Sequence, residues 1–337
     1  MALSKSIGIQ VKGIINLTPK NSEDNQTLDL LSQEERAALI KHTGIRYRRV
    51  NPNDNIGVKD YFNVGVEKLL KKLNWDKESI DILICVTQTP KIAIPSIACQ
   101  IHGDLDFESH VLCYDINSGC SGFVYGLHTI SQLLAGIDKS GARAVLCCGD
   151  ISTSLIDSND RSVRPIFSDA VSVIGIEKTD DQSISGYFHL ETMGKGQNAI
   201  RTESDGNGNS FMRLNGIDVF NYSVSHVPTN IQKLVDFSKI PTEEMDAFIF
   251  HQANKLINDS IAKKAGLDSS KLISSLYEYG NTASASIPLT LGTAWNDLSV
   301  KSKWILISGF GVGFSIASAM INFNPEICEP PEEIELN

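Results

Sequence analysis

"SIDILICVTQTP" at residues 79–90 and "EMDAFIFHQANK" at residues 244–255 are the two stretches that decide the fold of this chain. Each contains an acidic residue, an apolar run typical of a buried strand, and a polar turn that includes a glutamine. Two further pairs of segments recur in the same order, residues 119–127 with 283–291 and residues 142–150 with 302–310. Because the members of all three pairs are separated by about 160 to 165 residues, the sequence predicts two halves of related topology that meet around residues 175–215.

Apolar strands alternate with segments of helical periodicity along the chain, which predicts a layered α/β fold. "IDILICVT" precedes a predicted helix near residues 95–103, and "HVLCYDI" precedes a predicted helix that starts close to Cys120. We divide the chain into an N-terminal half, residues 1–175, and a C-terminal half, residues 176–337. Residues 201–214 are predicted as a surface loop, residues 216–238 as a helix, and the acidic, proline-containing tail at 324–337 as a frayed end.

Composition excludes several classes of function. The formal net charge is −10 at pH 7, which argues against nucleic-acid binding because phosphate recognition needs a concentrated basic surface. Seven cysteines without regular spacing indicate reduced thiols rather than a disulfide framework, and no metal-ligand spacing is present. No apolar run is long enough for a signal peptide or a membrane span. We therefore expect a cytoplasmic protein without a metal, a membrane or a nucleic-acid partner.

Cys120 is the first candidate for chemistry. It lies between glycines in "NSGCSGFVYGL", residues 117–127, directly before a run whose apolar residues fall on one helical face. Backbone N–H groups at a helix N-terminus favour thiolate over thiol, and Gly119 and Gly122 permit a close approach by a substrate. The alternative is a buried cysteine that packs as a small apolar residue, an alternative that fits Cys85, Cys99, Cys113, Cys147 and Cys148 well.

His251 and Asn281 are the candidate partners of the thiol. His251 directly follows the apolar run of "FIFHQANKLI", and Asn281 follows Gly280 at the end of a predicted strand in "YGNTASASIPLTL". Taken alone, each is more often a satisfied polar residue or a turn residue. Duplication brings equivalent strand ends together, so we expect Cys120, His251 and Asn281 to converge on one pocket.

That trio has a defined chemistry. A thiolate can accept an acyl group from a thioester, while a neutral imidazole and an amide donate hydrogen bonds to developing enolate charge. The glycine-rich turn "GFGVGFS" at residues 309–315 predicts an oxyanion hole formed by the backbone N–H groups of Cys120 and Val312. A phosphate-binding loop is the other interpretation of this turn, but its spacing and its late position argue against it.

With these motifs, the chain resembles the thiolase superfamily, and within it the β-ketoacyl-acyl-carrier-protein synthase III family. Three further segments fit the resemblance in family order: "HTGIRYRR" near the start, "IPSIACQI" before the cysteine, and "DRSVRPIFSDA" after it. The resemblance implies a five-layered αβαβα fold, a homodimer, Cys120 as acyl-accepting nucleophile, and His251 and Asn281 supporting decarboxylative condensation.

The resemblance also implies substrate contacts. It assigns Arg161 to the adenine and ribose end of coenzyme A, Asn254 to the tunnel of the thioester arm, Gly216 to substrate binding, and Ile94 to the acyl pocket of a partner subunit. The chain departs from the family at Ala38, where a tryptophan is common, and at His42, where an arginine is usual. Leu256 stands where a basic residue linked to carrier-protein docking is normal, which leaves docking open.

The resemblance therefore implies an enzyme that uses acyl-CoA and malonyl-acyl-carrier protein as substrates and holds no tightly bound cofactor. The main hypothesis is a decarboxylative Claisen condensation. The runner-up is transfer of the Cys120-bound acyl group to a hydroxyl or amine acceptor. A non-catalytic relative and a cysteine protease are weaker alternatives, because the nucleophile is retained and the sequence around Cys120 does not match a protease.

Overall fold

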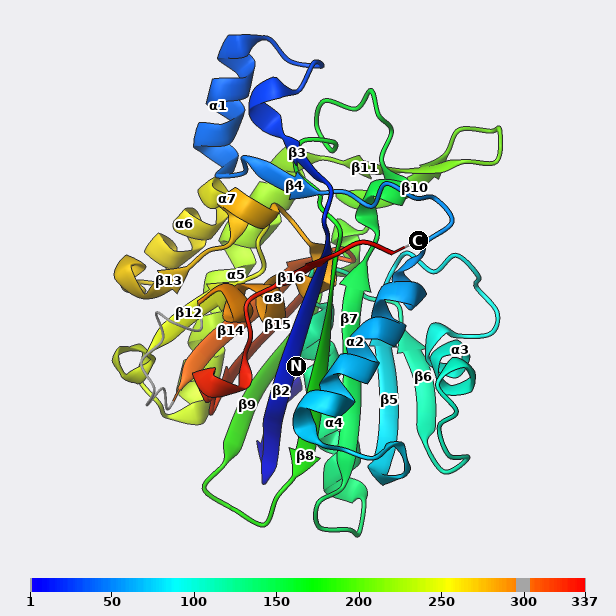
Figure 1. The fold of residues 1–337 in the computed structure, drawn as a ribbon. Coiled ribbons are helices and arrows are strands. Elements are labelled where there is room, and N and C mark those ends of the chain that lie inside the picture. Colours follow the sequence, from blue (N-terminus) through cyan, green and yellow to red (C-terminus); the bar gives the residue numbers. More distant parts are fainter. Residues whose placement is uncertain (1, 295–303, 337) are drawn as a thin grey trace.

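The structure is a computed structural model that describes residues 2–294 and 304–336. Two six-stranded mixed sheets form its centre (Figure 1). The first sheet consists of β16 (Glu332–Ile334), β2 (Ile9–Pro19), β8 (Ala170–Lys178), β7 (Arg143–Asp150), β5 (Ile80–Val86) and β6 (Leu112–Ile116), in that spatial order. The second consists of β1 (Ala2–Ile7), β9 (Ser185–Thr192), β15 (Ser315–Ile321), β14 (Ile305–Gly311), β12 (Ala247–Phe250) and β13 (Leu272–Ile273).

The two sheets repeat one topology. In the first sheet β2, β8 and β7 are successively antiparallel, whereas β7, β5 and β6 are parallel. In the second sheet β9, β15 and β14 are antiparallel, and β14, β12 and β13 are parallel. The strands β5 and β12 lie within the two similar stretches at residues 79–90 and 244–255. Two residues of the third repeated pair, 302 and 303, lie outside the described residues.

Helices cover both sheets and fill the space between them. α4 (Gly122–Gly136) and α8 (Ser286–Thr293) contact strands of both sheets and form the middle layer. α2 (Val58–Leu73) and α3 (Ile97–Asp104) cover the outer face of the first sheet, and α5 (Gly216–Ser238) and α6 (Lys255–Lys264) lie together beyond the second. The order of layers is therefore αβαβα, which confirms the predicted fold class. The helix predicted over residues 216–238 is α5.

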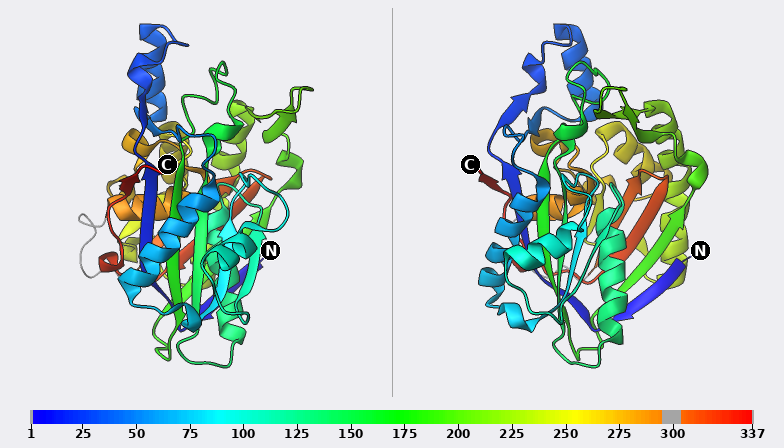
Figure 2. Two further views of the ribbon diagram at one scale, coloured as in Figure 1. Left: turned by 45° about the vertical axis from the view of Figure 1, so that its right-hand side comes forward. Right: turned by 90° about the vertical axis from the view of Figure 1, so that its right-hand side faces the viewer.

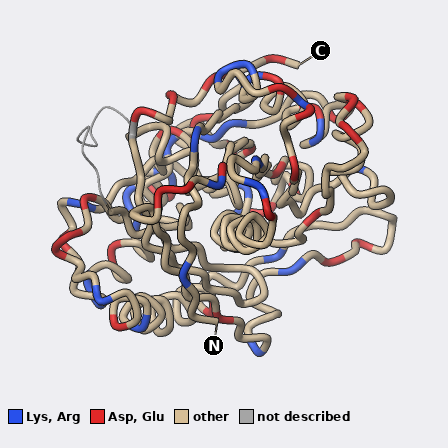
Figure 3. Tube along the Cα trace, turned by 90° about the horizontal axis from the view of Figure 1, so that it is seen from below, with Lys and Arg blue, Asp and Glu red and all other residues tan. Residues whose placement is uncertain are grey.

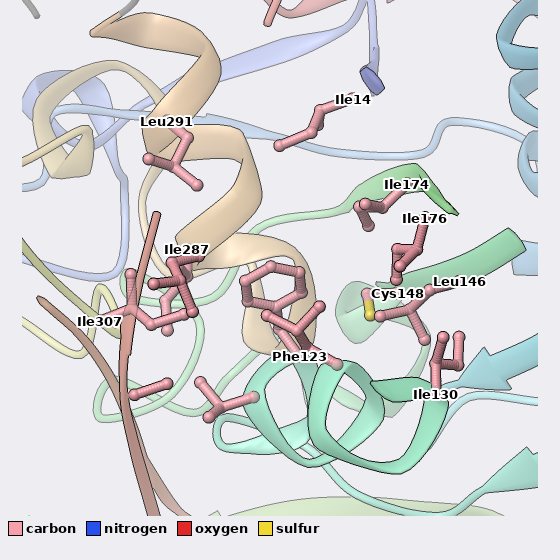
Figure 4. Close-up of a cluster of buried hydrophobic side chains, with 14 of the residues drawn as sticks. Ile14, Phe123, Ile130, Leu146, Cys148, Ile174, Ile176, Ile287, Leu291 and Ile307 are labelled. Carbon is pink, nitrogen blue, oxygen red and sulfur yellow. The ribbon is translucent and has the colours of Figure 1, made fainter. Parts of the chain in front are cut away.

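The core between the two sheets is shared by both halves. Figure 4 shows Phe123 of α4 and Ile287 of α8 pointing toward one another, with Ile174 of one sheet and Ile307 of the other nearby. The apolar residues that follow Cys120 lie on the face of α4 that packs there, as their spacing predicts. This packing fixes the start of α4, and with it the position of Cys120.

The two ends of the chain cross between the halves. β1 pairs with β9 in the second sheet, whereas β16 pairs with β2 in the first. The prediction of a frayed tail is therefore wrong for residues 332–334. Its acidic residues find basic partners far away in the sequence, because Glu332 pairs with Lys68, and Glu333 with Arg49 at 2.7 Å.

The remaining elements lie at one end of the sheets. α1 (Gln33–Thr43), the pair β3 (Ser22–Asp24) and β4 (Tyr47–Arg49), and the hairpin of β10 (Ile200–Ser204) and β11 (Ser210–Leu214) gather at this end in every view (Figures 1 and 2). The hairpin corrects the prediction of an irregular loop over residues 201–214. Seen from below, basic and acidic residues are interspersed along the trace (Figure 3).

Candidate active site

Cys120 lies at the entrance to α4, buried to 4% relative exposure. A tight turn precedes the helix, in which the N–H of Gly122 donates to the carbonyl of Gly119 over 2.7 Å. The strand end of β14 packs directly onto the thiol. A Cβ atom at Gly311, where φ is +152°, would lie 2.8 Å from Cys120 Sγ, so this position requires glycine.

The surroundings of the thiol act on its pKa in opposite directions. Burial, with a smaller contribution from the nearby Asp150 carboxylate, raises the pKa of Cys120 to about 12, although hydrogen bonds from the backbone of Val312 and of Cys120 itself act to lower it. The helix N-terminus also favours the anion. Near pH 7 the side chain of Cys120 is therefore a thiol in the free protein.

His251 follows the last residue of β12, as predicted, and its ring is buried. Its Nδ1 lies 2.8 Å from Ser286 Oγ at the start of α8, and the ring meets Phe310 edge to face. Burial lowers the pKa of His251 to about 3, so the imidazole is neutral near pH 7. A hydrogen bond with the backbone of Ala283 opposes this shift in part.

Asn281 follows a single helical turn, α7 (Leu276–Tyr279), and Gly280, so the predicted strand before it is wrong. Its backbone nevertheless forms an isolated parallel bridge with Phe167. The Oδ1 atom accepts a hydrogen bond of 3.0 Å from the backbone N–H of Ala283. This contact fixes the amide and leaves Nδ2 as a donor for the cavity.

One small cavity of about 50 Å³ brings Cys120, His251 and Asn281 together. Asn254 and Gly216, which the resemblance assigns to substrate binding, line the same cavity. Asn254 caps α6 by accepting from the N–H of Ile257 at 2.8 Å, and Gly216 is the first residue of α5. Five of the predicted positions therefore surround one space.

A second cavity, of about 190 Å³, lies on another side of Cys120. Val312, the predicted oxyanion donor, lines it, as do Gln88, Asp150 and Ser152, which sequence reasoning missed. Gln88 and Asp150 stand at the carboxyl ends of the parallel strands β5 and β7, where ligands bind in open α/β sheets, so the strand ends were the available signal. Phe167 and Ile200 line both cavities. Cys120 therefore stands between two spaces.

Two predicted contact residues line neither cavity. Arg161 forms an ion pair of 2.6 Å with Glu35 of α1, and both side chains are about half exposed. Ile94 lies in the loop before α3 with 87% of its surface exposed, so it does not contribute to the acyl space of its own chain.

The comparison with known proteins fits this geometry. Models of 3-oxoacyl-[acyl-carrier-protein] synthase III match residues 114–194, and models of its C-terminal region match residues 235–323. The chain is 30% identical to a solved 3-oxoacyl-(acyl-carrier protein) synthase from Burkholderia xenovorans, with 99% of each chain covered and a TM-score of 0.92. The chain belongs to the 3-oxoacyl-[acyl-carrier-protein] synthase III family.

Curated members of the synthase III family extend the similarity over almost the whole chain. The β-ketoacyl-[acyl-carrier-protein] synthase III of Lactococcus lactis is 29% identical over 319 residues, 90% of this chain and 96% of that protein. The enzyme of the same name from Prochlorococcus marinus strain MIT 9301 is 28% identical over 335 residues, 94% of this chain and 97% of that protein. Within the part of the chain that the structure describes, no helix is long and apolar enough to cross a membrane, and no cluster of three metal-binding side chains occurs.

Proposed function

We propose that this synthase III family member is a cytoplasmic condensing enzyme that joins an acyl group to a malonyl unit on an acyl carrier protein. The convergence of Cys120, His251 and Asn281 on one cavity carries this proposal. In the first step, the Cys120 sulfur attacks the carbonyl of an acyl thioester. The acyl group passes to Cys120, and the thiol proton leaves with the coenzyme A or carrier thiol.

In the second step, malonyl-carrier protein loses carbon dioxide, and the electron pair remains as an enolate. Nε2 of His251 and Nδ2 of Asn281 donate hydrogen bonds to the enolate oxygen, which two such donors stabilise by several kcal/mol. The enolate carbon then attacks the acyl carbonyl, and the Cys120–acyl bond breaks to give a 3-oxoacyl-carrier product. The released thiolate takes up one proton. The backbone N–H groups of Cys120 and Val312 bind the carbonyl oxygen during both attacks.

The two cavities fit this scheme, because one can hold the thioester arm and the other the acyl group. The thioester arm enters past Gly216 and Asn254 on the side of His251 and Asn281, and the acyl group extends into the larger space lined by Val312. Arg161 contacts the nucleotide of coenzyme A only when its ion pair with Glu35 opens, and an exposed pair of this kind contributes little to stability. Exposed Lys263 and Lys264 at the end of α6 supply basic charge for the carrier protein, since Leu256 does not.

We also propose a homodimer through the free edge of the first sheet. β6 is the edge strand there, Leu112 on it is 46% exposed, and the loop with Ile94 adjoins it. Exposed apolar side chains on an unpaired edge favour association with a second copy. Leu112→Lys with sedimentation analysis tests this: the variant should be monomeric, and an unchanged dimer would contradict the interface.

Incubation of the purified protein with acyl-CoA and malonyl-carrier protein tests the proposed function. Intact-mass spectrometry should show an acyl adduct on Cys120, and product analysis should show a 3-oxoacyl carrier. Cys120→Ala should lose both, whereas the exposed Cys99→Ala should lose neither. His251→Ala and Asn281→Ala should still load but release no carbon dioxide, and exposed His110→Ala should behave as wild type.

Two outcomes would contradict condensation. Stable acylation of Cys120 without a carbon–carbon product across a broad panel of donors would exclude it. Turnover of the acyl-enzyme with hydroxyl or amine acceptors in place of malonyl-carrier protein would instead support the acyl-transfer alternative.

A further inference from the structure

Arg48 on β4 is a charged side chain in an almost fully buried position, with 1% relative exposure. Withdrawal of a guanidinium from water is costly, and burial lowers the pKa of Arg48, although the carboxylate of Glu23 on β3 opposes this shift. The attraction within a buried ion pair is often no greater than the cost of removing its charges from water. Stability alone therefore does not explain a buried arginine at this place.

The guanidinium of Arg48 meets a different partner with each of its three nitrogens. Nε donates to Asn25 Oδ1 at 3.2 Å, Nη1 donates to the carbonyl of Phe167 at 3.3 Å, and Nη2 pairs with Glu23. The group is planar and its donors point in fixed directions. These contacts therefore hold the backbone of Phe167 in a fixed place relative to β3 and the turn that follows it.

Asn25 holds the same segment at a second point. This residue is fully buried at the start of the 3-10 turn Asn25–Thr27, and its Nδ2 donates to the carbonyl of Pro165 at 2.8 Å. Because Asn25 also accepts from Arg48, the two side chains act as one unit. That unit binds two carbonyl groups of the segment 165–168.

Asn281 binds the same segment through the carbonyl between those two. The N–H of Asn281 donates to the carbonyl of Ile166 at 3.0 Å, and the carbonyl of Asn281 accepts from the N–H of Ser168 at 2.9 Å. These bonds form the isolated bridge of Asn281 with Phe167. The backbone of Asn281 therefore lies on a segment that Arg48 and Asn25 fix.

Arg48 also lies directly beside the residue that precedes Asn281. A Cβ atom at Gly280, where φ is +59°, would lie 3.4 Å from Cγ of Arg48 and 3.0 Å from the carbonyl oxygen of Ile166. The stem of Arg48 and this carbonyl therefore form the surface on which Gly280 packs. Arg48 thus reaches Asn281 by two routes, one through the segment 165–168 and one through Gly280.

We propose that Arg48 is a positioning residue for the condensation, which acts on Asn281 through the segment 165–168. This inference rests on the proposed function, because it concerns a donor to the enolate. Since Oδ1 of Asn281 is bound by the N–H of Ala283, a shift of this backbone moves Nδ2 with it. The sulfur of Cys120 is held by α4 and β14 instead, so Arg48 acts on decarboxylation more than on acylation.

Arg48→Met tests the proposal, because methionine has a similar length and no hydrogen-bond donor. Two rates are measured: acylation of Cys120 by acyl-CoA, followed by intact-mass spectrometry, and release of carbon dioxide from malonyl-carrier protein. We expect kcat for decarboxylation to fall by about tenfold to a hundredfold with little change in KM, because a displaced donor to the developing charge has an effect of this size. The acylation rate should stay close to that of the wild type.

Arg48→Lys is a milder second variant. Lysine keeps a positive charge near Glu23, which favours folding if Arg48→Met does not fold, but it lacks the planar set of donors. We expect its decarboxylation to be slower than that of the wild type and faster than that of Arg48→Met, with acylation again unchanged.

Two control variants separate positioning from stability. Glu23→Gln removes the charge of the ion pair from its other end and leaves the other two contacts of Arg48 in place. Arg143→Met removes an ion-paired, partly buried arginine at the first residue of β7, whereas the site lies at the other end of this strand. Both controls should keep the wild-type ratio of decarboxylation to acylation.

A wild-type ratio in Arg48→Met or Arg48→Lys would overturn the proposal. Equal losses of both rates would also overturn it, because they would show a general effect on the fold. A loss of decarboxylation in Glu23→Gln as large as that in Arg48→Met would assign the effect to the ion pair instead. Failure of the wild type itself to release carbon dioxide would overturn the proposed function, so the two failures are distinguishable.

Discussion

At the scale of single residues, the position of the Cys120 sulfur is set by backbone rather than by side chains. Gly309 packs against the Cys120 carbonyl and Gly311 against its sulfur, so the end of β14 serves as the wall behind the nucleophile. The glycine-rich turn was predicted as a source of backbone donors. Its second role, close contact with the thiol, depends on a packing distance that no local sequence pattern encodes.

Gly311→Ala tests this wall. The added Cβ would lie 2.8 Å from both Cβ and Sγ of Cys120, at a φ that disfavours alanine. We expect acylation of Cys120 to slow by about a hundredfold, because a shift of about 1 Å in a reacting atom has that effect. Gly103→Ala on α3, where nothing lies within 4 Å of the added atom, is the control. Equal loading by both variants would contradict the argument.

Ser286 is a positioning residue, because it acts through His251. Loss of its contact with Nδ1 frees the imidazole to place its proton on either nitrogen. We expect Ser286→Ala to lower kcat for decarboxylation of malonyl-carrier protein by about tenfold with little change in KM. Ser286→Thr should restore it, and Thr293→Ala on the same helix should have no effect. A raised KM at constant kcat would point to substrate binding instead.

At the scale of elements, the sequence predicts strands and helices correctly where apolar periodicity is strong. It fails where a segment becomes a strand only by pairing with residues far away in the sequence. The strands before Cys120 and His251 and the helix over residues 216–238 are encoded locally. β16 is not, because its three residues include two glutamates and become a strand only beside β2 and the basic residues Arg49 and Lys68. The single turn of α7 before Asn281 is too short to show a helical period.

Removal of residues 330–337 tests how much β16 contributes to the stability of the fold. The segment contributes ion pairs worth at most about 1 kcal/mol each, a hydrogen bond of 3.0 Å from the N–H of Lys20 to Ile334, and apolar packing of Ile334. We expect the free energy of unfolding to fall by about 2 to 4 kcal/mol, measured by urea denaturation.

Glu332→Gln combined with Glu333→Gln isolates the charges of that strand. The free energy of unfolding of this variant should be lower than that of the wild type, and the difference should become smaller in 1 M salt, because salt screens exposed ion pairs. A truncated protein as stable as the full chain would show that β16 contributes nothing.

At the scale of the whole molecule, the two halves depend on one another although they repeat one topology. The core of α4 and α8 draws on both sheets, and the terminal strands β1 and β16 are exchanged between them. The sequence repeat revealed the duplication, but the exchange could not be predicted, since neither terminal strand has a counterpart in the repeat. The division at residue 175 therefore remains a prediction about ancestry rather than about independent folding units.

Expression of residues 1–175 alone tests this dependence. The piece exposes the face of α4 that packs on the second sheet and lacks β16, so we expect no cooperative unfolding transition and no near-ultraviolet circular dichroism. The full chain should give coincident transitions by fluorescence and circular dichroism. A cooperative transition of the isolated piece would show that the halves fold separately.

Asp150 forms hydrogen bonds with both halves, and its ionisation makes the stability of the folded protein depend on pH. It accepts hydrogen bonds from Thr87 in the first half and Ser284 in the second, and burial raises its pKa to about 6. In the unfolded chain its pKa is near that of a free aspartate. The folded protein therefore binds the extra proton, so the contribution of Asp150 to stability is full below about pH 4 and is lost as the pH rises through about 6.

Asp150→Asn removes this dependence. Between about pH 4 and pH 7 the free energy of unfolding of the wild type should fall relative to the variant by up to about 3 kcal/mol. Asp181→Asn is the control, because hydrogen bonds from Ser183 lower the pKa of Asp181, so the wild type should gain stability relative to this variant only as the pH rises to about 4 and should then stay level up to pH 7. A constant difference between wild type and Asp150→Asn across this range would mean that Asp150 keeps an ordinary pKa in the folded protein. The carboxylate would then be solvated, and the wall of the larger cavity open to water.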